Sequence, residues 1–243
     1  MTRRWTLPSL YNTVVLRSAT SVKHFSNALQ SSTFHDSKLD PPTPLCQLVK
    51  HLGILALGPV NTVQKIISRC TDLRSLACGH SGTLIQSDAL LYPKLHERHL
   101  LGFSCRDGIP FSQLSPGVTH LHVQIAVWEA LPTLLQLQDH LPRLTHLALS
   151  IPGTILGSCS IQVILDQVLE RNEDLEVVLV QTTDLSEEKF EVFEDRWKLD
   201  APSLDDRVVL RRAARSLVAQ WEDGSLFPGG LWSNSPTRNE LVG

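Results

Sequence analysis

Two stretches of the sequence carry nearly the same phrase: GVTHLHVQIA begins at Gly117, and RLTHLALSIP begins at Arg143. In both, apolar residues alternate with other residues, which is typical of a strand whose side chains point to opposite faces. The alternation recurs at intervals that run from 20 residues (Leu101 to Leu121) to 38 residues (Val14 to Leu52). The chain is therefore built from short repeated units. Their apolar pairs are Val14 and Leu16, Leu52 and Ile54, Leu76 and Cys78, Leu101 and Phe103, Leu121 and Val123, Leu147 and Leu149, and Val178 and Val180.

Helical periodicity fills the intervals between these strands. Apolar residues share one face from Val60 to Cys70 and from Ser160 to Arg171, and shorter or proline-containing examples run over 21–30 and 128–140. A strand followed by a helix, repeated at short intervals, is typical of a solenoid in which each strand lies beside the previous one. The sequence predicts an α/β solenoid of about seven strand-helix units, with one parallel sheet in chain order.

The residues after the seventh strand predict a cap. Ser203 and Asp206 have the spacing of a capping box, and an apolar stripe that includes Trp221 leads to Gly224. Because the last repeat of a solenoid exposes an apolar edge, we expect a capping helix at about 204–222 to cover it. One domain then spans 1–222, and 223–243, rich in Gly, Pro and Ser, is expected to be a disordered tail.

Composition excludes several classes of partner and compartment. A formal charge of -3 gives no bias toward nucleic acid, and 42% hydrophobic residues suffice for one substantial core. No apolar run is long and uninterrupted enough to predict a membrane span. Five cysteines without a CxxC pair indicate a reducing compartment, so we expect the protein in the cytoplasm or nucleus. The acid-free start leaves a targeting segment as an alternative.

Several stretches resemble leucine-rich repeats, whose core is L-x-x-L-x-L: WTLPSLYNTVVL, VKHLGILAL and DLRSLACG. Together with VAQWEDG, they resemble the irregular leucine-rich-repeat region behind the F-box of many fungal proteins, over roughly residues 5–222. The resemblance implies a leucine-rich-repeat-like solenoid and a non-catalytic substrate-recognition module that binds another protein. The Asn or Cys that follows a regular repeat strand is missing, which predicts an irregular horseshoe. No F-box is found, so we expect no docking on a ubiquitin-ligase adaptor.

Strand alternation singles out a candidate binding face. If the paired apolar residues face the core, the residues between them face the other way. This face is expected to bind the unidentified protein partner, with a loop or the tail over Val177 and Leu179 as the alternative. Three of the histidines also have the arrangement of zinc ligands, although the register explains their column without a metal, and we expect no metal and no cofactor. The predicted binding residues are His120, His122, Gln124, His146, Ser150, Val177 and Leu179.

One further motif suggests chemistry. GHSGT, which begins at Gly79 after a predicted strand, resembles the nucleophile elbow G-x-S-x-G, with Thr83 in place of the last glycine. Ser81, with Asp107 or Asp139 and then His146, would make the alternative function a serine hydrolase. A turn that leaves a repeat strand explains the same residues, and we therefore expect a binding protein and no enzyme.

Overall fold

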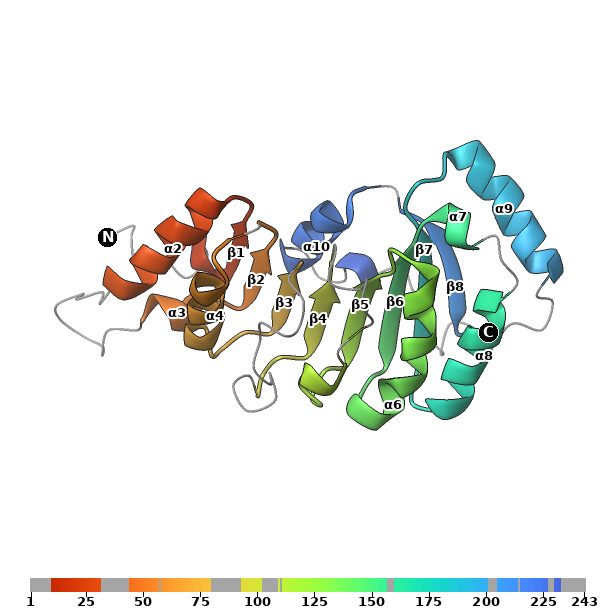
Figure 1. Ribbon diagram of the computed structural model, residues 1–243, viewed down its shortest axis with the longest axis horizontal. Coiled ribbons are helices and arrows are strands. Elements are labelled where there is room, and N and C mark those ends of the chain that lie inside the picture. The colour runs from red at the N-terminus through yellow and green to blue at the C-terminus, as the bar shows by residue number, and fades with distance from the viewer. Residues whose placement is uncertain are drawn as a thin grey trace.

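A computed structural model provides the three-dimensional structure of the chain (Figure 1). The described residues are 10–31, 44–56, 58–79, 93–101, 109, 111–156, 160–200, 205–213, 215–226 and 230–232. For residues 31, 160 and 200, only the backbone is described.

One parallel sheet organises the described part of the chain. Its eight strands lie side by side in chain order, from β1 to β8, as Figure 1 shows. The predicted parallel sheet in sequence order is therefore confirmed, with one strand more than expected. The strands are β1 (Thr13–Leu16), β2 (His51–Ile54), β3 (Ser75–Cys78), β4 (Glu97–Leu100), β5 (His120–Gln124), β6 (His146–Ile151), β7 (Val177–Thr182) and β8 (Val208–Arg212).

The fourth strand has a different register from the predicted one. Arg98, and not Leu101, pairs with Leu76 of β3 and with Leu121 of β5. Arg98 is fully buried there, and its guanidinium donates a hydrogen bond to the backbone oxygen of Leu76 at 3.2 Å. The prediction was wrong because the alignment required an apolar residue at a position where a charged one is accommodated by hydrogen bonding.

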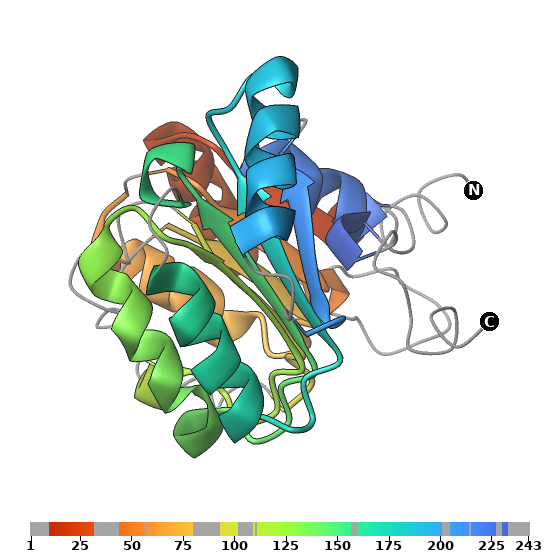
Figure 2. The same cartoon turned by 90° about the vertical axis from the view of Figure 1, so that its right-hand side faces the viewer.

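Helices cover one face of this sheet, here called the first face. Figure 2 shows η4, α6 and α8 together on that side. The helices predicted over 21–30, 60–70 and 160–171 are confirmed, and the stretch around Pro132 is a 3-10 helix that continues into a short α-helix. The elements outside the sheet are α2 (Ala19–Ser31), α3 (Leu45–Leu48), α4 (Val60–Arg69), η3 (Phe111–Gln113), η4 (Trp128–Gln136), α6 (Leu137–His140), α7 (Gly153–Leu156), α8 (Ser160–Arg171), α9 (Glu187–Asp200), α10 (Leu217–Leu226) and η5 (Gly230–Trp232).

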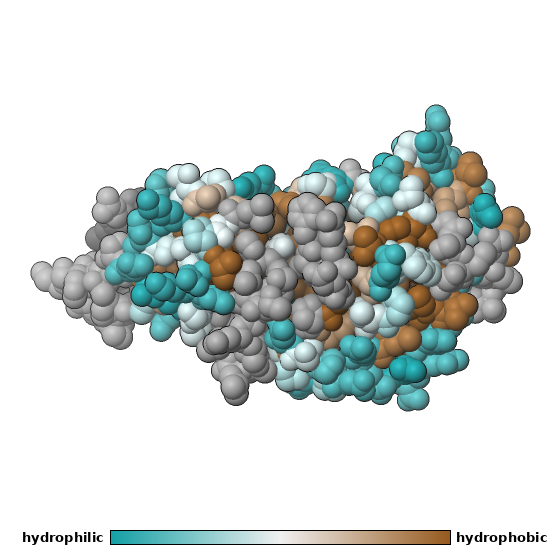
Figure 3. Space-filling model, viewed as in Figure 1, coloured by the Kyte–Doolittle hydropathy of each residue, from teal (hydrophilic) through white to brown (hydrophobic). Residues whose placement is uncertain are grey.

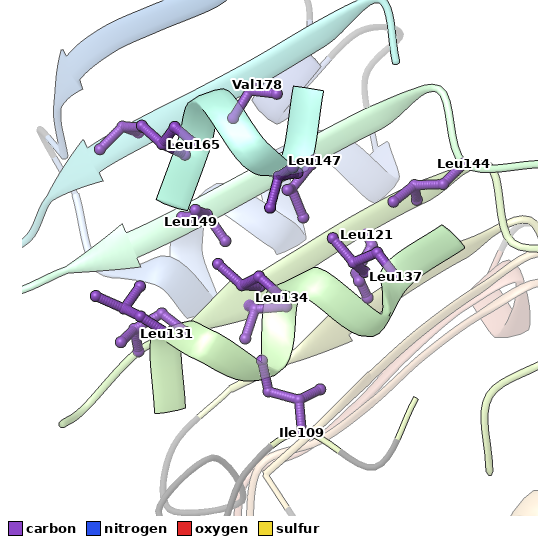
Figure 4. Packing of buried hydrophobic residues seen from close by; sticks show 14 of the residues in the cluster. Ile109, Leu121, Leu131, Leu134, Leu137, Leu144, Leu147, Leu149, Leu165 and Val178 are labelled. Carbon is purple, nitrogen blue, oxygen red and sulfur yellow. The ribbon is translucent and has the colours of Figure 1, made fainter. Parts of the chain in front are cut away.

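The main core lies between the first face and these helices. Figure 4 shows Leu121, Leu147 and Val178 of three successive strands pointing toward leucines of η4, α6 and α8. These strand residues are in register with one another, so each repeat adds one apolar layer to the core. A second cluster continues the core under α2 and α4, with Leu52, Leu76 and Ile66 among its members. Apolar burial on this scale is the main stabilising contribution to the fold.

The C-terminal region differs from the prediction. The helix expected at about 204–222 is replaced by strand β8 and, after a break, by α10, which extends to Leu226. The cap at the far end of the core is instead α9, whose Phe193 and Trp197 pack against the first-face cluster. The apolar stripe was misassigned because Val208 and Leu210 alternate with Val209, and a strand also places them on one face. Residues 230–232, predicted to be disordered, form η5.

No helix among the residues that the structure describes is long and apolar enough to cross a membrane.

Candidate functional site

The predicted binding residues lie together on the second face of the sheet, opposite the main core. His120 pairs in register with His146, and His146 with Val177. His122 is level with Leu179, two strands away, and Gln124 is directly beside Ser150. Strand alternation therefore places all seven of these residues on the second face, the side that the sequence pattern assigned to them.

The expectation that this face is open is wrong. His122, Ser150 and Leu179 are at most 1% exposed, and Val177 is 4% exposed. His120, Gln124 and His146 are partly buried. The face is covered by α10 and η5, which we call the C-terminal cover, and Figure 2 shows α10 on the opposite side of the sheet from η4 and α8. The alternative, in which the tail lies over Leu179, is the one observed, since Leu231 of η5 packs against the Leu179 side chain.

Trp221 anchors the first half of the cover. Its ring lies over Gly53, where an added Cβ would be only 2.5 Å from Cζ3 of the indole. The indole Nε1 donates a hydrogen bond to Oγ of Ser75 at 3.1 Å. Leu217, one turn earlier, joins Ala77 and Leu101 in the same small apolar cluster. Small residues on β2 and β3 thus form a slot that accommodates the indole of Trp221.

Trp232 anchors the second half of the cover. Its Nε1 donates a hydrogen bond to Oε1 of Glu97 at 2.9 Å. The rings of His120 and His146 are stacked with centroids 4.3 Å apart, and both meet the indole edge to face, at 5.2 and 5.7 Å. Such aromatic geometry stabilises contacts beyond the area that they bury. Next to Trp232, Leu231 packs on Ala148 and Leu179.

The repeated Thr-His phrase has a structural explanation at this site. Thr119 Oγ1 donates to the backbone oxygen of His96 at 3.2 Å and lies 2.9 Å from Nδ1 of His120. Thr145 repeats both contacts one strand later, with the oxygen of Thr119 and Nδ1 of His146. Because each hydroxyl hydrogen is used on a carbonyl, each imidazole donates from Nδ1. The phrase fixes two rings in the same orientation, and they stack.

A buried polar network runs beneath the cover from β4 to α10. His99 Nδ1 lies 3.1 Å from Nδ1 of His122, whose Nε2 lies 2.7 Å from Oγ of Ser150. Ser150 donates to Oε1 of Gln181, and Gln181 Nε2 donates to Oε1 of Gln220 in α10. Every step links neighbouring elements, so the network joins four strands to the cover. Buried hydrogen-bond networks of this kind favour one arrangement of the elements that they join.

The directions of these hydrogen bonds assign the protons. Since Ser150 donates to Gln181, its Oγ accepts from Nε2 of His122, and Nδ1 of His122 then accepts from His99. Nε2 of His99 lies 3.0 Å from Oε1 of Glu97. This is a close polar contact in which the ring nitrogen is not aligned for a hydrogen bond.

Burial and neighbouring groups shift several pKa values at this site. Burial opposes the charge of Glu97, but the nearby His99 and hydrogen bonds from Trp232 and Ser75 outweigh it, so the pKa of Glu97 lies below its usual value. Burial and the charge of His99 hold the pKa of His122 well below normal. Burial and the neighbouring His146 lower the pKa of His120 to about 4. The imidazoles of His120 and His122 are therefore neutral at neutral pH.

A second candidate site lies at the edge where the strands begin. An open groove of about 550 Å³ runs across the segments that precede β4, β5, β6 and β7. Figure 3 shows hydrophilic residues along the lower rim of the molecule, where Figure 1 shows these strands to start. The groove is lined by Pro93, Lys94, Leu95, His96, Gly117, Thr119, Pro142, Arg143, Thr145, Asp174 and Glu176.

The backbone repeats itself along this edge groove. In each unit, one carbonyl accepts from two consecutive N–H groups of the next unit: Thr119 and His120 donate to His96 at 2.9 and 3.0 Å. Thr145 and His146 donate likewise to Thr119, and Glu176 and Val177 to Thr145. Equivalent positions of successive repeats are thereby held side by side, with charged side chains at both ends of the groove.

The motif that suggested a serine hydrolase lies mostly outside the described residues. Of GHSGT, only Gly79 is described, so the predicted nucleophile Ser81 lies outside those residues, as does Asp107. His146 has its Nδ1 on Thr145 and not on a carboxylate. Across the described ranges, no group of three or more His, Cys, Asp or Glu side chains is arranged to hold a metal ion.

Sequence reasoning missed Glu97, His99 and the two tryptophans of the cover. The first two were missed because the fourth strand was aligned on Leu101, which hid their place beside His120 and His122. An alignment on Arg98 would have revealed them.

Comparison with known proteins yields no match to any family model, any curated protein or any solved structure.

Proposed function

We propose that this protein is a leucine-rich-repeat-like solenoid that binds another protein through the edge groove and catalyses no reaction. The proposal rests on the groove, which is open to solvent, whereas the second face is closed by the chain's own cover. We place it in the cytoplasm or nucleus, where the thiols of Cys46 and Cys70 stay reduced.

The single observation that carries the proposal is the repetition along the groove. Four successive repeats contribute equivalent segments to it, each held by the same pair of backbone hydrogen bonds. A surface with a regular spacing between equivalent positions suits an extended polypeptide, because residues along such a segment also recur at regular intervals. Extended binding surfaces of this kind are the usual way in which repeat proteins recognise partners.

Charge narrows the kind of segment that would fit. Lys94 and Arg143 are exposed on the segments before β4 and β6, and Asp174 and Glu176 are exposed on the segment before β7. We infer a segment with an acidic residue opposite the two bases and a basic residue opposite the two acids. Charges at exposed positions contribute modestly to affinity but set orientation and exclude segments with the opposite order.

The resemblance to the repeat region of fungal F-box proteins also favours protein binding as the function. By that resemblance, the repeats would select a substrate protein, and we expect no docking on a ubiquitin-ligase adaptor. The irregular repeat length, with β4 and β5 close in sequence and β1 and β2 far apart, is compatible with such a region.

The test is a charge exchange that keeps the net charge constant. Arg143→Glu combined with Glu176→Lys exchanges the charges of the neighbouring segments before β6 and β7. Lys65→Glu combined with Glu170→Lys, on exposed positions of α4 and α8, is the matched control. Proteins captured from a lysate by the wild type are quantified by mass spectrometry, and the strongest is then purified for direct binding measurements.

We expect the groove exchange to abolish capture and direct binding, and the control exchange to retain both. Binding by the wild type should also weaken as salt is raised, because the exposed charges are screened. If the groove variant is folded and still binds the purified partner with unchanged affinity, the groove is not the binding surface.

A further inference from the structure

A second surface, independent of the edge groove, has the construction of a binding site for a polypeptide. The second face of the sheet has a slot over Gly53 and Ala77 that holds one indole, and a shallow position over Ala148 that holds Leu231. Two polar acceptors, Ser75 and Glu97, each take an indole N–H. These features select tryptophan over other apolar residues, since a phenyl ring would leave both acceptors without the indole N–H donor.

The C-terminal cover packs separately from the main core. Its apolar contacts form two small clusters, one around Leu217 and Trp221 and one around Leu231, and neither cluster includes residues of the main core. The helices of the first face, by contrast, share extensive apolar clusters with the strands. Regions with few buried apolar contacts open at lower free energy than the rest of a domain.

The face beneath the cover is also suited to exposure. Its central positions carry polar or small side chains, among them Ser75, Glu97, His99 and His122, whereas the first face of the same strands is mainly apolar, with Arg98 as an exception. Water can replace the hydrogen bonds of such groups when the cover leaves. The cover is held at its rim by exposed groups, including an ion pair between Arg17 and Glu222.

We propose that the second face is a binding site for a tryptophan-bearing helical segment of a partner protein, and that the C-terminal cover occupies this site as a tethered ligand. The cover defines the chemistry of the partner: a short helix with one indole that fills the Gly53 slot, and a second indole further along the chain that reaches Glu97. A partner segment competes with a tethered one, so binding requires the cover to open first, and the tether reduces the apparent affinity of the partner.

The test uses the full-length chain and a labelled synthetic peptide with the sequence of residues 215–232, RSLVAQWEDGSLFPGGLW. Fluorescence anisotropy measures its binding to the wild type and to the double variant Trp221→Ala, Trp232→Ala, in which the cover has lost both anchors. A second variant, Asp223→Pro, weakens α10 from its solvent-accessible part without touching the sheet. A peptide with both tryptophans changed to alanine is the matched control.

We expect each variant to bind the peptide at least about tenfold more tightly than the wild type, because the cover no longer competes. The alanine peptide should bind none of them. Addition of Arg143→Glu to the double variant should leave peptide binding unchanged, so this test and that of the edge groove succeed or fail separately.

Three outcomes would overturn the proposal. One is that a variant is folded, as judged by slow hydrogen exchange in β6 and α8, and does not bind the peptide. Another is that both variants unfold as a whole, because the cover is then part of the fold and cannot be exchanged. The third is that the variants form dimers without added peptide, because the occupant is then the cover of a second copy.

Discussion

Gly53→Ala is expected to destabilise the seating of the cover, although alanine normally stabilises a strand relative to glycine. The new Cβ would lie 2.5 and 2.9 Å from two ring carbons of Trp221, which is held in place by its hydrogen bond to Ser75. Overpacking of this kind costs about 1–3 kcal/mol of stability, and replacing glycine by alanine inside a strand returns about 0.5–1 kcal/mol. The net loss is about 1–2 kcal/mol.

Hydrogen exchange of the α10 amides measures this loss directly. A loss of about 1–2 kcal/mol corresponds to roughly 5- to 30-fold faster exchange in α10. Gly58→Ala is the control, since the nearest atom to its Cβ, Cγ1 of Val22, lies at 3.4 Å. The control should leave exchange in α10 unchanged.

A double-mutant cycle then isolates the contact. Trp221→Ala alone should lower the free energy of opening of the cover by up to about 3–5 kcal/mol, and by no more than its value in the wild type. In the Trp221→Ala background, the added methyl at Gly53 meets no ring, so its effect should change from unfavourable to neutral or favourable. The two changes should therefore be coupled by about 1–3 kcal/mol. Additive effects, or slower exchange in Gly53→Ala alone, would refute the proposed seating of Trp221 on Gly53.

Three further outcomes follow from the structure. The pKa of His120 is about 4 in the folded state against 6.5 normally, so its contribution to stability is present above about pH 6.5 and is lost as pH falls toward 4, by up to about 3 kcal/mol. Urea unfolding across that range should show the decline, and His120→Phe should make it smaller, since His122 also contributes to it. Leu147→Ala in the main core should cost about 2–5 kcal/mol in urea unfolding, whereas Leu226→Ala, 64% exposed, should change stability by less than about 0.5 kcal/mol. Thr145→Val should cost about 1 kcal/mol in the same assay, because the partly buried backbone oxygen of Thr119 and the ring of His146 each lose one hydrogen-bond partner, and Thr145→Ser should retain most of the stability.

The repeated pattern of the sequence was sufficient to predict the sheet. Alternation around Leu121, Leu147 and Val178 predicted strands, their order and the face that each side chain occupies, because a strand has a period of two residues wherever it lies. The helices with a clear apolar stripe, such as Ser160–Arg171, were predicted with their bounds. The same rule failed at β4, where Arg98 occupies a core position that the pattern reserves for an apolar residue.

The candidate site was predicted in part. The sequence placed His120, His122 and His146 side by side on one face, since register alone determines that arrangement. It did not reveal that the face is buried, because burial depends on contacts between residues that are far apart in the chain. Trp221 and Ser75 are separated by 146 positions, and no local periodicity reports such a contact.

What the sequence by itself determined is therefore local: which residues form strands, which way their side chains point, and which repeats are neighbours. These follow from backbone geometry and the period of the apolar pattern. Only the tertiary structure decided where α10 and η5 lie, because their few apolar residues could cover the end of the sheet or its second face with similar local structure. The choice is made by complementary shapes and hydrogen bonds, an indole over Gly53 and another against Glu97, and these exist only once the strands have assembled.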